Sequence, residues 1–339
     1  MQTLTLPYAP SPTGTPLPTS VHYSPGGPPK PIILLLHAGG FASGSPAMIP
    51  PAQIAHLAAA RGAVVACPAY RLCPTTTLGG GPVADARAAL AWARAGLPAA
   101  LAERGVRADG RRVGVVGYSA GGMLALELGN EPDPPSAILD FYGVKYLDEA
   151  FWARPFAGFA GVPDAPRELV MRVYEDEEAP TEAPPMFVDG KPDLKTPRSA
   201  WMIGAIKRGW LYRACIAGPE SKSWGWGEGS GSVGEVRAED VAAVEATRGF
   251  AGKAEGKKWP PTCFVHGTAD VFAPFELAER AEKELREAGG EVKLIKVEGA
   301  AHVFDMALKE GDALFDGPVV EALDWLIGKM RTVDWEWHG

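Results

Sequence analysis

The stretch R-R-V-G-V-V-G-Y-S-A-G-G-M-L-A-L-E-L, residues 111–128, is the most informative part of this chain. An apolar strand pattern leads into Gly117, and a helical pattern begins directly after Ser119. A G-x-S-x-G sequence in this context marks a strained turn that exposes a serine hydroxyl at the carboxyl edge of a sheet. The free amides at the helix start then face any negative oxygen that forms there. We therefore predict that Ser119 is a nucleophile; the alternative is a glycine-rich packing or phosphate-binding turn.

Strand and helix patterns alternate on both sides of this turn. Alternation of this kind is typical of a parallel, doubly wound α/β sheet. Residues 1–31 hold nine prolines, which favour edge strands and turns over a helix. The predicted strands are 32–36, 63–66, 112–116, 137–142, 262–266 and 292–297, and the predicted helices are 51–61, 83–95, 120–128, 276–288 and 319–330.

Two further motifs follow predicted strands. H-A-G-G-F at 37–41 places a glycine pair where backbone amides could turn toward a substrate carbonyl. Y-R-L-C-P at 70–74 follows the next strand. With G-Y-S-A-G-G, these motifs resemble the hormone-sensitive-lipase-like branch of the α/β-hydrolase fold. The resemblance implies an oxyanion hole formed by the amides of Gly39, Gly40 and Ala120. Ala38 departs from the family's usual first glycine, a change that we expect to spare those donors.

A serine nucleophile needs a base and an acid, which follow it in this fold in the order Ser, Asp or Glu, His. Three of the six histidines follow Ser119. The resemblance implies that His302, in G-A-A-H-V-F, is the base. We interpret His266 as a structural residue that supports the acid loop, and His338 as part of a frayed tail. His22, His37 and His56 precede the nucleophile, and we do not expect them to carry the proton.

The acid is predicted to be Asp270, in H-G-T-A-D after the strand 262–266. One helix and one strand fit between Asp270 and His302, as the wiring of the fold requires. Asp140 is the alternative, because it lies near the end of the strand 137–142, where some hydrolases carry their acid. Asp305 is too close to His302 in sequence to be its usual partner.

Residues 143–260 show no clear strand pattern and exceed the length of a plain crossover. We predict that residues 1–143 and 261–339 form the α/β-hydrolase core and that residues 144–260 form an inserted cap or lid. Six of the ten tryptophans lie in the insertion, and Trp201, Trp210, Trp224 and Trp226 are candidates for contact with substrate. The glycine-rich stretch 224–234 is predicted to be a mobile loop.

Composition excludes several other classes of function. The net charge is −8 and the pI is about 5.4, which argues against nucleic-acid binding. The longest aliphatic run, 32–36, is too short to cross a membrane, and the first residues lack a signal-peptide pattern. We therefore expect a cytoplasmic protein without membrane contact, a metal or a cofactor. Its oligomeric state is left open. The cysteines are expected to be free thiols: Cys67, Cys73, Cys215 and Cys263.

The expected function is that of a serine carboxylesterase acting on small-molecule esters with short, medium or aromatic acyl groups. The same triad could instead serve a lactonase, an arylformamidase, or an enzyme that releases or cyclises a chain in a biosynthetic pathway. A ligand receptor on the same fold would need the pocket but not the triad. A prolyl-oligopeptidase-type peptidase shares the H-G-T-x-D sequence, but nothing in the chain could form its propeller.

Overall fold

The computed structural model describes residues 1–226, 233–250 and 259–331. Its central feature is an eight-stranded sheet in the order β1-β2-β4-β3-β5-β6-β9-β10. The six strands β4, β3, β5, β6, β9 and β10 pair in parallel with their neighbours in this order. At one edge, β1 pairs antiparallel with β2, and β2 pairs antiparallel with β4. This confirms the predicted α/β class. The strands are β1 Gln2–Pro10, β2 Pro16–Tyr23, β3 Lys30–Leu36, β4 Val64–Pro68, β5 Ala108–Tyr118, β6 Ala137–Phe141, β9 Thr262–Gly267 and β10 Val292–Val297.

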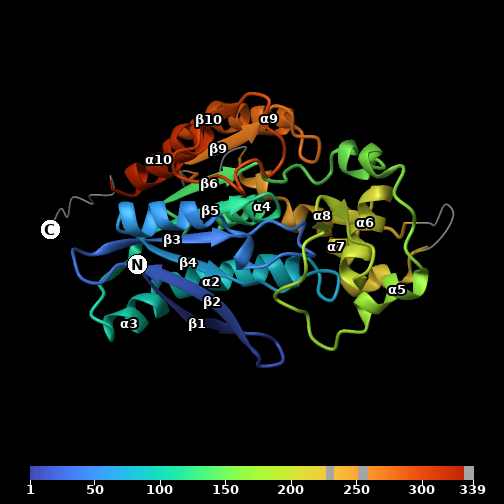
Figure 1. Cartoon of the computed structure of the whole chain (residues 1–339), viewed down its shortest axis with the longest axis horizontal. Coiled ribbons are helices and arrows are strands. Elements are labelled where there is room, and N and C mark those ends of the chain that lie inside the picture. Colours follow the sequence, from blue (N-terminus) through green and yellow to red (C-terminus); the bar gives the residue numbers. More distant parts are fainter. Residues whose placement is uncertain (227–232, 251–258, 332–339) are drawn as a thin grey trace.

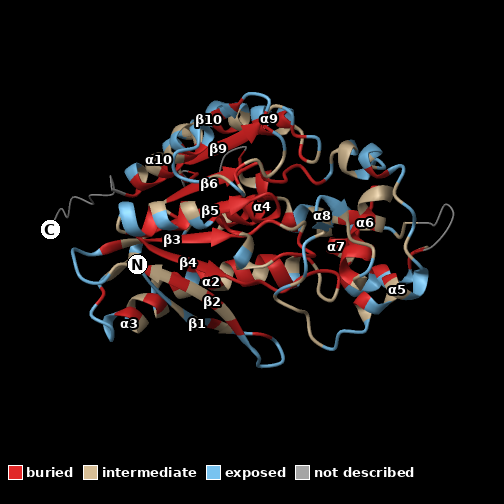
Figure 2. Ribbon diagram, in the orientation of Figure 1, coloured by how far each residue is buried: buried red, intermediate tan, exposed pale blue. Residues whose placement is uncertain are grey.

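Helices cover both faces of the sheet, and the central strands are buried along their length (Figure 2). Alternate residues of β3 belong to the two core clusters: Ile32, Leu34 and Leu36 face one, and Ile33 and Leu35 the other. The first cluster includes side chains of α2 Ala84–Arg94, α3 Gly96–Ala102, α4 Ala120–Glu127 and α9 Phe275–Glu287. The second includes side chains of α1 Pro51–Ala55 and α10 Val320–Arg331. A continuously apolar strand is what a sheet with two covered faces requires.

The segment between β6 and β9 lies beyond one end of the sheet (Figure 1). It contains α5 Arg167–Met171, α6 Pro197–Arg208, α7 Leu211–Ala217 and α8 Ala238–Val244. It also contains a small antiparallel pair, β7 Phe187–Val188 with β8 Lys191–Pro192. Strands of two residues are too short to leave a periodic pattern, which explains why the sequence showed no strand here. Most of the predicted mobile loop at 224–234 lies outside the described residues.

The four candidate tryptophans form an aromatic cluster inside this segment. Trp226 packs against Trp201 and Trp210, with ring centroids 5.5 Å apart in both pairs, and Trp224 lies 6.2 Å from Trp210. All four are at most 8% exposed. The indole N–H of Trp201 donates to the hydroxyl of Tyr174 at 2.8 Å. These buried rings belong to the first core cluster, which extends from the sheet into this segment. None of the helices in the described residues is long and apolar enough to cross a bilayer.

Candidate active site

Ser119 occupies a tight turn between β5 and α4. Its backbone adopts φ 53° and ψ −113°, a strained conformation for a residue other than glycine. Glycine is required on both sides. A Cβ on Gly117 would lie 2.0 Å from the carbonyl oxygen of Gly121, and a Cβ on Gly121 would lie 2.1 Å from that of Leu36. The G-x-S-x-G spacing is thus the steric condition for bringing strand, turn and helix this close together.

Ser119, His302 and Asp270 form a continuous hydrogen-bonded relay. The Ser119 hydroxyl lies 2.9 Å from Nε2 of His302, and Nδ1 of His302 lies 2.6 Å from Oδ2 of Asp270. Ser119 is 7% exposed and Asp270 is 8% exposed, so both hydrogen bonds are shielded from bulk water. A base bonded on one nitrogen to a hydroxyl and on the other to a carboxylate has the geometry needed to activate a serine.

The Asp270 carboxylate is also held by its own loop. Its second oxygen accepts from the backbone amides of Phe272 and Ala273, both at 2.9 Å. Nε2 of His266 lies 3.2 Å from Oδ2 and 2.8 Å from the carbonyl of Ala273. Burial by itself would raise the pKa of Asp270, but the hydrogen bonds from His266 and His302 outweigh it and hold the pKa well below its usual value. Asp270 is therefore a carboxylate at neutral pH, and His266 has the supporting position expected from the sequence.

Asp140, the alternative acid, lies in a different environment. Its Oδ2 is 2.8 Å from Nζ of Lys145, and neither side chain is exposed to solvent. The ammonium of Lys145 also donates to the carbonyl of Gly143. Asp140 thus belongs to a buried ion pair at the end of β6, whereas Asp270 is the carboxylate in contact with the histidine.

The H-A-G-G-F turn packs directly against the serine turn, since the space beside Gly121 is filled by the carbonyl oxygens of Leu36 and His37. Gly39 has φ 130°, and a Cβ there would lie 2.0 Å from the carbonyl oxygen of Ser43. Gly40 has φ 57°, in the left-handed region. Ala120 is the first residue of α4. The three predicted oxyanion residues therefore lie in two backbone segments that meet at Ser119.

His37 stabilises this turn, and its ring has no side-chain hydrogen-bond partner within the described part of the chain. Its ring stacks on Tyr70 at 4.1 Å, and the Tyr70 hydroxyl donates to the His37 carbonyl at 2.9 Å. Burial lowers the pKa of His37 to about 4, and its buried Nε2 has no hydrogen-bond partner among the residues that the structure describes. The Tyr70 contact gives the Y-R-L-C-P motif a structural role. The imidazole of His37 is neutral at physiological pH.

A cavity of about 450 Å³ is lined by residues that pack against the triad and the H-A-G-G-F turn, although no residue of the triad or the turn is among its described lining residues. Phe272 forms one wall, with its ring centroid 5.7 Å from that of His302. Leu211 forms another beside Gly40, and Tyr212 packs edge-on against Phe41 at 6.0 Å. Among the described residues that line this cavity, Arg154 is the only charged one. The other described lining residues are Phe151, Trp152, Pro155, Phe156, Ala157, Gly158, Ile206, Gly209 and Val271.

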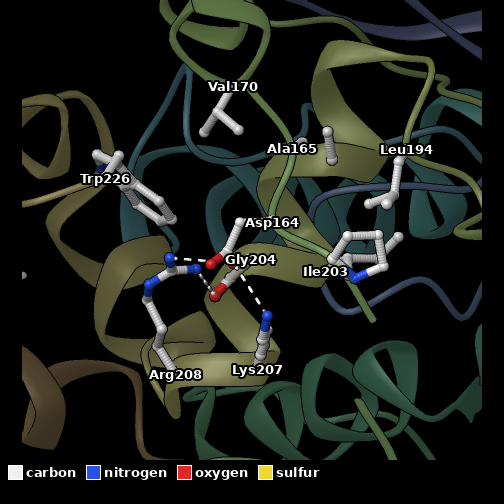
Figure 3. A pocket seen from close by; sticks show the side chains of 11 residues that line it. Asp164, Ala165, Val170, Leu194, Ile203, Gly204, Lys207, Arg208 and Trp226 are labelled. Atoms are coloured by element: carbon white, nitrogen blue, oxygen red, sulfur yellow. Dashed lines mark hydrogen bonds and ion pairs between the residues drawn. The ribbon is translucent and has the colours of Figure 1, made fainter. Parts of the chain in front are cut away.

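None of the four tryptophans named from the sequence is among the described residues of this cavity. Trp226 instead lines a small cavity within the inserted segment, beside Asp164, which forms ion pairs with Lys207 and Arg208 (Figure 3). That space is about 10 Å³, enough for one water molecule at most. The lining residues Trp152 and Tyr212 were missed because the aromatic content of the insertion does not show which rings face the triad.

Other chemistries have little support in the described part of the chain. It contains no group of three or more His, Cys, Asp or Glu side chains arranged to hold a metal ion. All four cysteines are buried and free. Burial raises the pKa of the thiols of Cys67 and Cys263 to about 12, so they remain protonated at neutral pH.

Comparison with known proteins agrees with this architecture. A family model described as the α/β hydrolase fold matches residues 33–205. Among solved structures, the esterase LipW of Mycobacterium marinum matches with a TM-score of 0.61 and 21% identity, covering 97% of this chain and 82% of LipW. The propionate-bound esterase Est2 of Thermogutta terrifontis matches with a TM-score of 0.59 and 22% identity, covering 96% and 94%. The fold predicted from the motifs is confirmed.

The curated relatives are larger proteins. A non-reducing polyketide synthase of Aspergillus calidoustus is 33% identical over 306 residues, which cover 86% of this chain and 12% of the synthase. The 5-methylorsellinic acid synthase of Aspergillus terreus is 30% identical over 337 residues, which cover 93% of this chain and 13% of the synthase. The chain therefore spans about an eighth of the length of these relatives.

Proposed function

Because the chain belongs to the α/β-hydrolase fold family, we propose that it is a serine hydrolase that cleaves a carboxylic ester through an acyl-enzyme intermediate. One observation carries the proposal: the Ser119 hydroxyl lies 2.9 Å from an imidazole whose other nitrogen lies 2.6 Å from the Asp270 carboxylate. In this family fold, such a relay at a strained strand–helix turn generates a nucleophile.

The first half of the reaction acylates the enzyme. Oγ of Ser119 attacks the acyl carbon while Nε2 of His302 takes the hydroxyl proton, and Asp270 stabilises the resulting imidazolium. The negative charge moves to the former carbonyl oxygen, where the amides of Gly39, Gly40 and Ala120 stabilise it. The C–O bond to the leaving group then breaks, and His302 returns the proton to the departing alkoxide. An ester of Ser119 and a free alcohol result.

The second half repeats these steps with water. His302 removes a proton from a water molecule as its oxygen attacks the acyl carbon, and the same amides stabilise the second tetrahedral intermediate. The bond to Oγ breaks, Ser119 regains its proton from His302, and a carboxylic acid leaves.

The cavity beside the triad indicates the substrate class. Its aromatic walls and volume of about 450 Å³ suit a compact apolar or aromatic acyl group better than a long flexible chain. We propose that residues 144–260 act as a cap, because Leu211 and Met202 of this segment pack directly over Gly40. A cap that excludes water strengthens the contacts to the oxyanion.

A fluorophosphonate probe tests the mechanism. Ser119 is expected to be the labelled residue, and Ser119→Ala is expected to abolish both labelling and the turnover of p-nitrophenyl esters. Ser136→Ala is the matched control, because this half-buried serine lies on another loop, before β6, and should leave both measurements unchanged. Labelling of a different serine, or no labelling of the folded wild type, would refute the proposal and favour a non-catalytic binding role.

A second candidate function is release of a thioester-bound chain in a biosynthetic pathway, favoured by the alignment with polyketide synthases over most of this chain. Here a thiol leaves in place of the alcohol, and the acyl-Ser119 ester is resolved by water or by a hydroxyl of the chain itself. Mass spectrometry of the protein after reaction with an aromatic N-acetylcysteamine thioester tests it. Acylation of Ser119 by the thioester without turnover of any simple ester supports this reading, whereas rapid ester turnover without acylation by the thioester refutes it.

A further inference from the structure

A second buried carboxylate, that of Asp305, lies in the loop that carries the histidine of the triad. Asp305 follows His302 by three residues in the same loop and is 0% exposed. Within the described residues, no lysine or arginine forms an ion pair with it. Burying a carboxylate without a cation costs several kcal/mol, so an apolar residue would be the more stable choice for this site. The presence of Asp305 here therefore calls for an explanation other than stability.

Neutral donors from two distant elements satisfy the Asp305 carboxylate. Its Oδ1 accepts from the hydroxyl of Tyr142 at 2.5 Å, and its Oδ2 accepts from the side-chain amide of Gln53 at 2.6 Å. The amide oxygen of Gln53 accepts from the hydroxyl of Tyr118 at 2.8 Å. The side chains of Gln53, Tyr118 and Tyr142 are as fully buried as Asp305. We name this chain of hydrogen bonds, from Tyr142 through Asp305 and Gln53 to Tyr118, the Asp305 network.

The Asp305 network joins the residue that precedes Ser119 to an aromatic ring that packs against His302. At one end, Tyr118 immediately precedes Ser119 in the chain. At the other end, the ring of Tyr142 lies edge-on to the imidazole of His302, with centroids 5.0 Å apart. The backbones of Ser119, Tyr142 and Val303 all have positive φ, at 53°, 42° and 53°. Strained residues of this kind persist only where their surroundings fix them.

We propose that Asp305 is a positioning residue: it fixes the His302 loop relative to the Ser119 turn, so that Nε2 of His302 stays within hydrogen-bond distance of the serine hydroxyl. The inference rests on the proposed function, since it concerns the same triad. A loss of alignment of about 1 Å at reacting atoms lowers turnover by about a hundredfold. Asp305 acts through Tyr142 and Gln53, without contact with the substrate.

Asp305→Asn keeps the shape of the side chain but replaces one acceptor oxygen with a donor, which then faces the hydroxyl of Tyr142 or the amide of Gln53. We expect kcat for a p-nitrophenyl ester to fall about ten- to a hundredfold while KM stays within about twofold, because the substrate cavity is untouched. Tyr118→Phe removes the last hydroxyl of the network and should also lower kcat. In the double variant, the two losses should be less than multiplicative, as for side chains that act as a unit.

Asp324→Asn is the control for the same substitution at another hydrogen-bonded aspartate, because Asp324 on α10 lies 2.8 Å from Nε2 of His56, a histidine outside the triad. It should leave kcat unchanged. If Asp305→Asn does not fold, Tyr142→Phe tests the same link and retains the aromatic ring beside His302. A folded Asp305→Asn with wild-type kcat, or a change confined to KM, would overturn the proposal. Fully multiplicative losses in the double variant would do so as well.

A spectroscopic measurement separates this proposal from the proposed function. The proton between His302 Nδ1 and Asp270 should give a low-field NMR resonance in the wild type, whether or not any ester is turned over. In Asp305→Asn we expect that resonance to broaden through exchange as the loop loosens, whereas an unchanged resonance would contradict the positioning role. Failure of the wild type to react with a fluorophosphonate would refute the hydrolase mechanism without altering this resonance.

Discussion

Trp152 and Tyr212 form a partition whose removal should change the length of acyl chain that the protein accepts. Their rings meet edge to face, with centroids 4.8 Å apart at an interplanar angle of 88°. On one side is the cavity of about 450 Å³ beside the triad, and on the other is a second cavity of about 410 Å³. Trp152 and Tyr212 are the only described residues that line both. Trp152→Ala should therefore join the two spaces.

The expected magnitude follows from the hydrophobic effect. Each methylene that becomes buried contributes about 0.8 kcal/mol, which corresponds to about a fourfold gain in kcat/KM. In the wild type this gain should continue along a series of p-nitrophenyl esters until the first cavity is filled, and kcat/KM should then fall. In Trp152→Ala the rise should continue to longer chains, because the second cavity becomes available to the acyl group.

Two controls make this prediction specific. Trp152→Phe retains an aromatic ring at the partition and should keep the wild-type optimum. Ile216→Ala enlarges only the second cavity, which the partition still closes, and should have no effect on the optimum. Trp152→Ala also removes the hydrogen bond from the indole to the Lys145 carbonyl, so its folding should be checked by circular dichroism. A folded Trp152→Ala with an unchanged chain-length profile would refute the partition.

Three further predictions concern the triad, the oxyanion turn and pH. Asp270→Asn should lower kcat by about 10⁴-fold because the imidazole of His302 loses its orienting acceptor. Asp140→Asn should have a much smaller effect on kcat. Steady-state kinetics that show the reverse ranking would contradict the assignment of Asp270 as the acid. Gly39→Ala should abolish turnover or folding, because the new Cβ would overlap the backbone carbonyl of Ser43. The Cβ of Gly40→Ala would meet only the flexible side-chain ends of Met202 and Leu211, so this variant should lower kcat less. Equal activities of the two variants in an ester assay would argue against this difference. In the unfolded state, His37 takes up a proton as the pH falls below about 6.5. In the folded state its pKa is about 4, so it stays neutral until the pH is much lower. This should remove about 3 kcal/mol of stability by pH 4, and urea denaturation of His37→Gln should lack that component.

Much of the site could be predicted from local sequence because it depends on turns whose chemistry is local. Glycines at 117 and 121 are a steric condition of the serine turn, and each motif follows directly after a strand of the sheet. Parallel strands bring their carboxyl ends to one edge, so Ser119, Asp270 and His302 meet although they are far apart in sequence. The choice between Asp270 and Asp140 depends on tertiary contacts, because both residues lie near strand ends. Only the structure shows that Asp140 forms an ion pair with Lys145.

The remaining features depend on contacts between distant segments, which no local pattern contains. Composition showed that the inserted segment is rich in tryptophan, but Trp201 and Trp226 pack against each other, whereas Trp152 reaches the cavity beside the triad. Asp305 was set aside because it is close to His302 in sequence, yet its hydrogen-bond partner Gln53 lies 252 residues away. Periodicity and turn chemistry determine which elements form and which residues end them. Which side chains then meet depends on how the elements pack, because burial and hydrogen bonding are satisfied over the whole fold.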